Sequence, residues 1–221
     1  MSIIDQIKEK AKQLGKTIVL PESDDERVIR AAELIKKEGI SNVILVGEEA
    51  RLREDAKKYG VNLEGIEIIN PKNYSKFDNY VAEFVKLREK KGMTEQVARQ
   101  IMSTEPRFFG AMMVRLGDAH GMVAGSSSPT ADVLRASIQV VGTKPGLRTV
   151  SSCFLMVMPE ATKQYGNNGV LIFSDCGVVP NPTSEQLADI ATSAASSARS
   201  LVAMEPKVAL LSFSTKGSAK H

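Results

Sequence analysis

The residues best suited to chemistry lie in a stretch that begins at Gly125 and reads Gly-Ser-Ser-Ser-Pro-Thr. A short apolar run, residues 121–124, precedes it, and a segment with helical spacing of apolar residues follows it. A strand, a loop of small residues and a helix start form an anion site in that order, because the first amides of a helix have no partner within the helix and its dipole favours negative charge. The pattern therefore predicts a phosphate-binding loop.

Hydroxyl and cationic side chains in or beside this loop could add contacts to an anion. The candidates are Ser126, Ser127, Ser128, Thr130, Arg135 and Lys144. The loop lacks the Gly-Lys-Ser/Thr ending of a Walker motif and has no GxGxxG sequence, so a serine-rich turn that caps a helix is the competing interpretation.

A second stretch near the end of the sequence has a similar composition and favours the anion-binding interpretation. It comprises residues 212–218 and follows an apolar run, residues 207–213, that we predict to be a strand. Its candidate side chains are Ser214, Thr215 and Lys216.

Arg88 is a further candidate because it continues the apolar stripe of a helix predicted over residues 74–90. It lies four residues beyond Phe84, so it shares the buried face rather than the solvated one. A guanidinium on that face needs an anionic partner, or it must extend along the helix to reach solvent. The sequence leaves both interpretations open.

Acidic, thiol and imidazole side chains give weaker indications. The acidic run Glu22, Asp24, Asp25 and Glu26 suits a metal or proton transfer, but its place at a predicted helix start explains it without either. The cysteines and histidines are few and lack metal-ligand spacing, so no metal site is predicted; they are Cys153, Cys176, His120 and His221. Cys176 is interpreted as a small buried thiol rather than an acyl carrier.

The composition is that of an ordinary globular chain. Its 221 residues are 43% hydrophobic and 25% charged, and the net charge is +3 with both signs mixed along the sequence. This mixture argues against a nucleic-acid surface, and no apolar run is long enough to cross a bilayer. The N-terminal segment lacks the features of a secretory signal, so we expect a cytoplasmic protein with small-molecule partners and no membrane partner.

Strands alternate with helical segments through the first part of the chain. The predicted strands are residues 17–20, 42–46, 66–69 and 121–124. Strands and helices that alternate at this pace indicate βαβ units, so we predict an α/β fold with a mainly parallel sheet.

The pattern changes after Lys144-Pro145-Gly146. Two predicted strands are joined through Gly-Asn-Asn-Gly at residues 166–169, which indicates a β-hairpin. Thr183 and Gln186 then resemble a capping box that opens an alanine-rich helix. We therefore place a boundary near residue 145, with one domain at 1–145 and another at 146–221.

Four motifs in order resemble the phosphate acetyltransferase (phosphotransacetylase) family. They are Leu20-Pro21-Glu22 with the acidic turn, residues 125–146, Phe173-Ser174-Asp175-Cys176-Gly177 with Pro182-Thr183, and residues 207–220. The resemblance covers essentially the whole chain. It implies reversible transfer of an acetyl group between coenzyme A and inorganic phosphate, with acetyl phosphate as the other product. The implied fold is an αβα sandwich of isocitrate/isopropylmalate dehydrogenase-like architecture, with two domains, a cleft between them and assembly as a homodimer.

The resemblance also implies roles for particular residues. Arg88 and Arg135 match family arginines that bind coenzyme A and phosphate, and the two hydroxyl-rich stretches match the family's anion-binding loops. Coenzyme A is a substrate, and no cofactor is implied. The family pattern continues with a Ser-Arg pair and an aspartate that acts as a base toward the thiol, and this sequence lacks both. The chain therefore resembles a C-terminally truncated form whose first domain lacks its final segment. Glu22 and Asp175 are then the nearest acidic candidates for a base.

Three alternatives compete with this function. Phosphate butyryltransferases share the scaffold, so the resemblance defines the type of reaction better than it defines the specificity for the length of the acyl chain. The chain could instead be a non-catalytic fragment that binds coenzyme A or phosphate and dimerises. A nucleotide-binding dehydrogenase is disfavoured because no GxGxxG follows a predicted strand.

Overall fold

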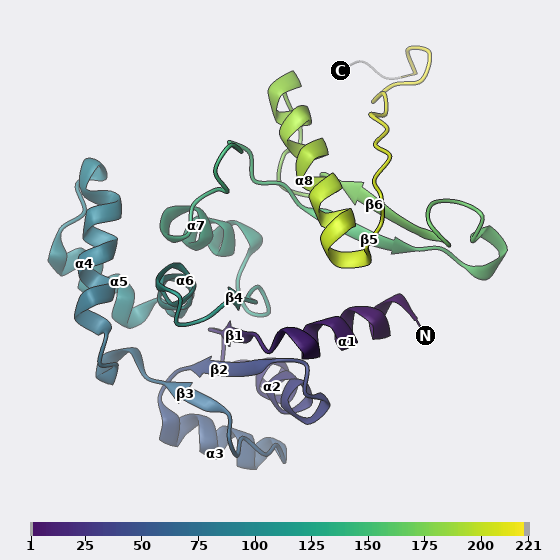
Figure 1. The fold of residues 1–221 in the computed structure, drawn as a ribbon. Coiled ribbons are helices and arrows are strands. Elements are labelled where there is room, and N and C mark those ends of the chain that lie inside the picture. The colour runs from purple at the N-terminus through teal and green to yellow at the C-terminus, as the bar shows by residue number, and fades with distance from the viewer. Residues whose placement is uncertain (1, 219–221) are drawn as a thin grey trace. The chain divides into compact units, whose positions relative to one another are not determined.

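The structure is a computed structural model that describes residues 2–218 (Figure 1). The chain divides into two compact units, the first ending at Gly142 and the second beginning at Thr143. This division lies beside Lys144-Pro145-Gly146, where the sequence pattern changes.

The first unit is built on a parallel sheet with the strand order β3-β2-β1-β4 (Figure 1). The strands are β1 (Thr17–Leu20), β2 (Asn42–Val46), β3 (Glu67–Ile69) and β4 (Gly121–Met122). β1 pairs with β2 on one side and with β4 on the other. Because all four strands run in the same direction, the loops that follow β1 and β4 leave the same edge of the sheet as neighbours.

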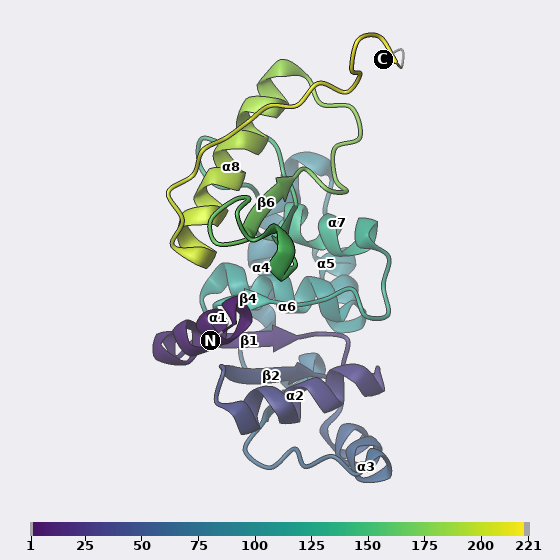
Figure 2. The ribbon, with the colours of Figure 1, turned by 90° about the vertical axis from the view of Figure 1, so that its right-hand side faces the viewer.

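Helices cover both faces of this sheet (Figures 1 and 2). After α1 (Ile3–Leu14), the helices on one face are α2 (Glu26–Glu38) and α3 (Glu49–Tyr59). Those on the other face are α4 (Phe77–Arg88), α5 (Glu95–Thr104), α6 (Pro106–Leu116) and α7 (Thr130–Val140). Short 3-10 turns lie at Pro71–Asn73 and Glu89–Lys91. The first unit is therefore a three-layer αβα sandwich.

The residues of β2 show why the sheet is sandwiched. Ile44 and Val46 pack into the cluster with α4 to α7, whereas Val43 and Leu45 pack into the cluster with α2 and α3. Successive strand residues point to opposite faces, so a run that is apolar at every position requires cover on both sides. The predicted α/β fold with a parallel sheet is confirmed.

The second unit contains an antiparallel hairpin of β5 (Cys153–Val157) and β6 (Val170–Ser174), with α8 (Ser184–Val202) against β6. A 3-10 turn at Glu160–Thr162 lies between the two strands. Asn168 and Gly169 have φ values of 52° and 80°, which asparagine and glycine tolerate. Thr183 and Gln186 form a reciprocal capping box at the start of α8. The predicted hairpin and cap are both confirmed.

The strand predicted at residues 207–213 is wrong. The segment has no strand assignment, and Leu210 and Leu211 are 68% and 90% exposed. A strand forms where a neighbouring strand can pair with its backbone. In the described part of the second unit, the sheet consists of β5 and β6 alone.

The helix that the apolar spacing after the serine-rich stretch indicates is present as α7. Ile138 and Val141 are 48% and 42% exposed, whereas Ala136 and Val140 are fully buried. The helix contacts α4 and α6, and Val140 joins the large cluster that these helices share. Apolar spacing alone did not distinguish this contact face from the neighbouring one.

Candidate functional site

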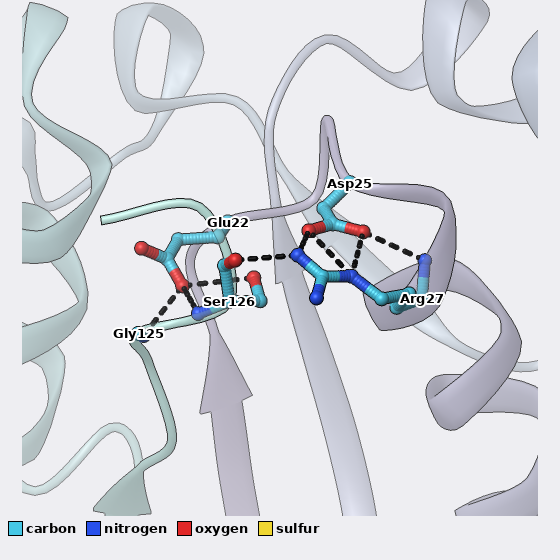
Figure 3. A network of polar contacts seen from close by, with 5 residues as sticks. All are labelled: Glu22, Asp25, Arg27, Gly125 and Ser126. Atoms are coloured by element: carbon cyan, nitrogen blue, oxygen red, sulfur yellow. Dashed lines mark hydrogen bonds and ion pairs between the residues drawn. The ribbon is translucent and has the colours of Figure 1, made fainter. Parts of the chain in front are cut away.

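The serine loop, defined here as residues 125–130, connects β4 to the start of α7. It begins at Gly125, whose φ of 110° lies in the region that favours glycine. Since β4 pairs with β1, this loop meets the segment that follows β1, and Figure 3 shows Glu22 and Ser126 pointing toward one another. The site therefore forms where two parallel strands end side by side.

Glu22 occupies the amides at the beginning of the serine loop (Figure 3). Its Oε2 accepts hydrogen bonds from the Gly125 amide at 2.6 Å, from the Ser126 amide at 2.7 Å and from the Ser126 hydroxyl at 3.0 Å. Glu22 is only 5% exposed, and its Oε1 is buried without a hydrogen-bond partner among residues 2–218. A side-chain carboxylate thus takes the Ser126 hydroxyl, which the sequence assigned to phosphate, together with two backbone amides of the loop.

This contact keeps the Glu22 carboxylate charged. Burial raises its pKa, but the nearby Ser128 hydroxyl and the donors of Gly125 and Ser126 outweigh burial and lower the pKa to about 2. A carboxylate with so low a pKa is a weak proton acceptor near neutral pH. Glu22 is therefore poorly suited to act as a base toward a thiol.

Arg27 holds the same turn from its carbonyl side (Figure 3). Its Nη2 donates to the Ser126 carbonyl oxygen at 2.5 Å and also contacts Asp25. Asp25 in turn accepts from the Arg27 amide and caps α2, and the Arg27 guanidinium is the main cause that lowers the pKa of Asp25 to about 2. The amide, carbonyl and hydroxyl of Ser126 are thus all engaged within the protein, so its predicted phosphate contact would need these bonds to change.

A pocket of about 340 Å³ opens beside the loop within the first unit. The charged residues of its lining are Glu22, Asp24, Glu48, Arg51 and Arg107, and its hydroxyl residues are Ser23, Thr104, Ser127 and Ser128. Small-molecule sites in open parallel sheets lie outside the carboxyl ends of the strands, and this pocket adjoins the segments that follow β1, β2 and β4. The structure thus brings Ser127 and Ser128 together with two arginines.

Arg107 is a functional candidate that no motif in the sequence marks. Its side chain is 19% exposed, and it pairs with Glu105 at 2.8 Å and with Asp132 at 3.6 Å. It lies in the first turn of α6, directly after Pro106. A cation there opposes the helix dipole, and this unfavourable placement is the signal by which the sequence could have revealed it.

The remaining candidates of the first unit have different settings. Arg135 pairs with Asp132 at 2.7 Å and its side chain is 58% exposed. Thr130 is the first residue of α7, which begins after Pro129 without a side-chain cap. Arg88 ends α4, and its Nε is buried with no hydrogen-bond partner in the described chain. Arg88 therefore retains an unsatisfied donor, as its place on the apolar stripe suggested.

The second hydroxyl-rich stretch lies in the second unit and is largely exposed. Its backbone turns at Lys216, which has a φ of 53°, and the Ser218 amide donates to the Thr215 carbonyl. The Ser212 hydroxyl donates to the Ser214 carbonyl at 2.7 Å. Ser214, Thr215 and Lys216 thus lie on a turn that follows backbone without a strand assignment rather than the predicted strand.

Asp175 is the centre of a hydrogen-bond network in the second unit. It accepts bonds from the amide and hydroxyl of Ser152, each at 2.7 Å, and from the amides of Val178 and Val179. Burial raises the pKa of Asp175, but these bonds outweigh burial and hold it well below its usual range. The Cys176 thiol lies 3.1 Å from the same Ser152 hydroxyl. Asp175 is therefore a structural acceptor and a poor base.

Other reactive groups have ordinary structural settings. The Thr17 amide donates to Nδ1 of His120, and His221 lies outside the described residues. Among the side chains of residues 2–218, no group of three or more histidines, cysteines or acids could hold a metal ion. None of the described helices is both long and apolar enough to span a membrane.

A parallel α/β unit with hydroxyls and arginines at the carboxyl edge of its sheet is typical of proteins that bind anionic small molecules. The sequence profile of one family, described as phosphate acetyl/butaryl transferase, matches residues 2–221. The chain belongs to this family.

Individual relatives agree with this assignment. The chain is 46% identical to a phosphate acetyltransferase of Thermoanaerobacterium thermosaccharolyticum over 221 residues, which cover all of this chain and 66% of that protein. A phosphate acetyltransferase of Acetivibrio thermocellus is also 46% identical, over 220 residues and 65% of its length. The chain thus spans slightly less than two thirds of the length of these relatives.

Solved structures show the same fold. A phosphotransacetylase from Streptococcus pyogenes is 37% identical with a TM-score of 0.88, and the match covers 100% of this chain and 65% of the other. The EutD phosphotransacetylase from Staphylococcus aureus is 36% identical with a TM-score of 0.85, over 99% of this chain and 63% of the other.

Proposed function

We propose that this chain carries the anion-binding part of a phosphate acetyltransferase, which transfers an acetyl group reversibly between coenzyme A and inorganic phosphate. The observation that carries the proposal is the pocket at the sheet edge, where Ser127 and Ser128 lie with Arg107, in a chain of this family. Hydroxyl donors and guanidinium groups are the side chains that bind phosphate oxygens best.

The reaction needs an oriented acyl phosphate and a thiol nucleophile. In the direction of acetyl-CoA synthesis, the thiolate sulfur attacks the carbonyl carbon, and the bond from that carbon to the phosphate oxygen breaks to release phosphate. Ser127, Ser128 and Thr130 would hold the phosphate, together with Arg107 and Arg135. Cations and hydroxyls there stabilise the charge that the leaving phosphate gains.

Coenzyme A is a substrate in this proposal, and no cofactor is needed. Arg88 and Arg135 would bind its phosphates, as the family resemblance implies, and the buried Nε of Arg88 is a donor still available for such a contact. The second loop, with Ser214, Thr215 and Lys216, would add a further anion contact. No catalytic base is assigned, since the pKa values of Glu22 and Asp175 are both lowered.

The proposal extends to assembly and location. We expect a cytoplasmic homodimer, with substrates as its small-molecule partners. The alanine-rich sequence of α8 supports this expectation, because small side chains allow another element to pack closely.

The test is arsenate-dependent loss of acetyl-CoA, since arsenate replaces phosphate and the acyl arsenate hydrolyses. It should be measured for the 221-residue chain and for a chimaera that adds the part of the Thermoanaerobacterium relative left uncovered by the match. Turnover by the chimaera supports the proposal, and butyryl-CoA in the same assay tests the longer acyl chain. If both proteins bind coenzyme A without turnover, the non-catalytic alternative is favoured instead.

A further inference from the structure

We propose that Glu22 is a positioning residue for the serine loop, fixing the Gly125–Ser126 turn so that Ser127 and Ser128 face the pocket. The inference rests on the proposed function and deepens it. It assigns to Glu22 neither proton transfer nor contact with substrate, but control of the loop that binds the substrate anion.

The contact joins two segments that are far apart in sequence. Glu22 and Gly125 are 103 positions apart, and the parallel pairing of β1 with β4 brings them together. One oxygen of Glu22 accepts all three hydrogen bonds, from two consecutive amides and a hydroxyl. Bonds to consecutive amides fix the backbone of the turn, whereas a single contact would leave it free to rotate.

Burial of a carboxylate is costly unless hydrogen bonds compensate it, and Glu22 is only 5% exposed. An apolar side chain would fill the same space without this penalty but would leave two loop amides unsatisfied. Arg27 completes the arrangement by donating to the Ser126 carbonyl from the other side (Figure 3). The turn at Ser126 is thus held through its donor groups and through its acceptor.

The arrangement also divides the loop into two parts. The amides of Gly125 and Ser126 are satisfied by the Glu22 carboxylate, whereas Ser127 and Ser128 line the pocket, with the Ser128 hydroxyl near that carboxylate. An incoming phosphate therefore meets the second part of the loop, in a conformation set by the first. Loss of the internal carboxylate should loosen that conformation before any substrate arrives.

The test compares Glu22→Gln and Glu22→Ala with Glu26→Gln as the matched control. Glu26 lies in the same acidic run, but it pairs with Arg30 on the exposed side of α2. Two quantities are measured for each variant. The first is hydrogen exchange of the Gly125 and Ser126 amides. The second is the KM for phosphate and for acetyl-CoA, measured in whichever of the 221-residue chain and the chimaera turns over acetyl-CoA.

We expect Glu22→Ala to speed exchange at these two amides, with β1 and β2 unchanged, and to raise the phosphate KM about tenfold with little change for acetyl-CoA. Glu22→Gln should show a smaller effect because its amide oxygen still accepts hydrogen bonds. A general loss of stability would instead speed exchange throughout the sheet. If Glu22→Ala does not fold, Glu22→Gln decides.

Two results would overturn the inference. One is unchanged exchange at Gly125 and Ser126 in the folded variants. The other is a lower phosphate KM, which would mean that the carboxylate competes with the substrate anion rather than preparing its site. If neither the 221-residue chain nor the chimaera turns over acetyl-CoA, the proposed function fails. The exchange measurement on the 221-residue chain still decides whether Glu22 positions the serine loop.

Discussion

Arg135 donates a hydrogen bond to Asp132 at 2.7 Å within the first turns of α7. Asp132 also faces Arg107 at 3.6 Å, so two cations beside the serine loop share one carboxylate. A phosphate brought to this place would compete with Asp132 for both guanidinium groups. Asp132 therefore partly neutralises both arginines, while Glu105 also pairs with Arg107 at 2.8 Å.

Substitution of Asp132 by asparagine should strengthen phosphate binding. The change removes the competing negative charge and leaves Arg135 and Arg107 more available, an effect of about 1 kcal/mol for partly exposed pairs. We expect the phosphate KM to fall severalfold in the active form of the protein. Asp78→Asn is the control, since Asp78 pairs with Arg99 on an exposed surface. A higher KM in the Asp132 variant would contradict the competition.

Replacement of Arg135 by alanine should weaken phosphate or acetyl phosphate binding. Loss of a charge-assisted contact costs on the order of 1.5 to 3 kcal/mol, which should appear in the phosphate KM. Arg99→Ala is a matched control because Arg99 is a half-exposed helical arginine paired with acids. If the phosphate KM of Arg135→Ala equals that of the parent, Arg135 lies outside the site.

The stability of the first unit should depend on pH through Glu22. The folded-state pKa of about 2 lies below the usual 4.5, so the carboxylate stabilises the fold above pH 4.5. This contribution is lost as the pH falls from 4.5 toward 2, and it amounts to at most about 3 kcal/mol. Urea unfolding at pH 7 and pH 3 measures the difference. Glu22→Gln should flatten the dependence, and an equally steep loss in that variant would show that other groups cause it.

The second unit should depend on Asp175 for stability. In Asp175→Asn one acceptor oxygen remains, as a weaker acceptor, and the NH₂ group that replaces the other cannot accept its bonds. The bonds lost are those from Ser152 or those from Val178 and Val179, which go to different carboxylate oxygens. We expect a loss of about 1–3 kcal/mol in the free energy of unfolding. Glu160→Gln is the control, because Glu160 forms an exposed pair with Lys163. A loss no larger than that of the control would show that the network tolerates the amide.

Much of the fold follows from signals that are local in the sequence. The bounds of β1 and β2 match the predicted strands because buried parallel strands are short, continuous apolar runs. The turn at residues 166–169 and the cap at Thr183 depend on neighbouring residues, so their residue types were sufficient.

The candidate site was less predictable because its contacts are not local. The serine loop was identified by its composition. Its partner Glu22 follows a different strand, and it was interpreted as part of an acidic helix start or as a candidate base, not as a partner of the loop. Arg107 carries no motif and becomes a candidate through the pocket that folding creates. The run at residues 207–213 has the composition of a strand, yet composition cannot supply the neighbouring strand that it needs.

The exposed run after α8 also affects how the chain behaves in solution. Val208, Leu210 and Leu211 present exposed apolar side chains on backbone that belongs to no strand or helix. Unpaired backbone with apolar side chains can pair between molecules, and lysine at such positions suppresses that pairing. Concentrated samples should therefore self-associate, as light scattering would report, and Leu211→Lys should keep the chain dispersed.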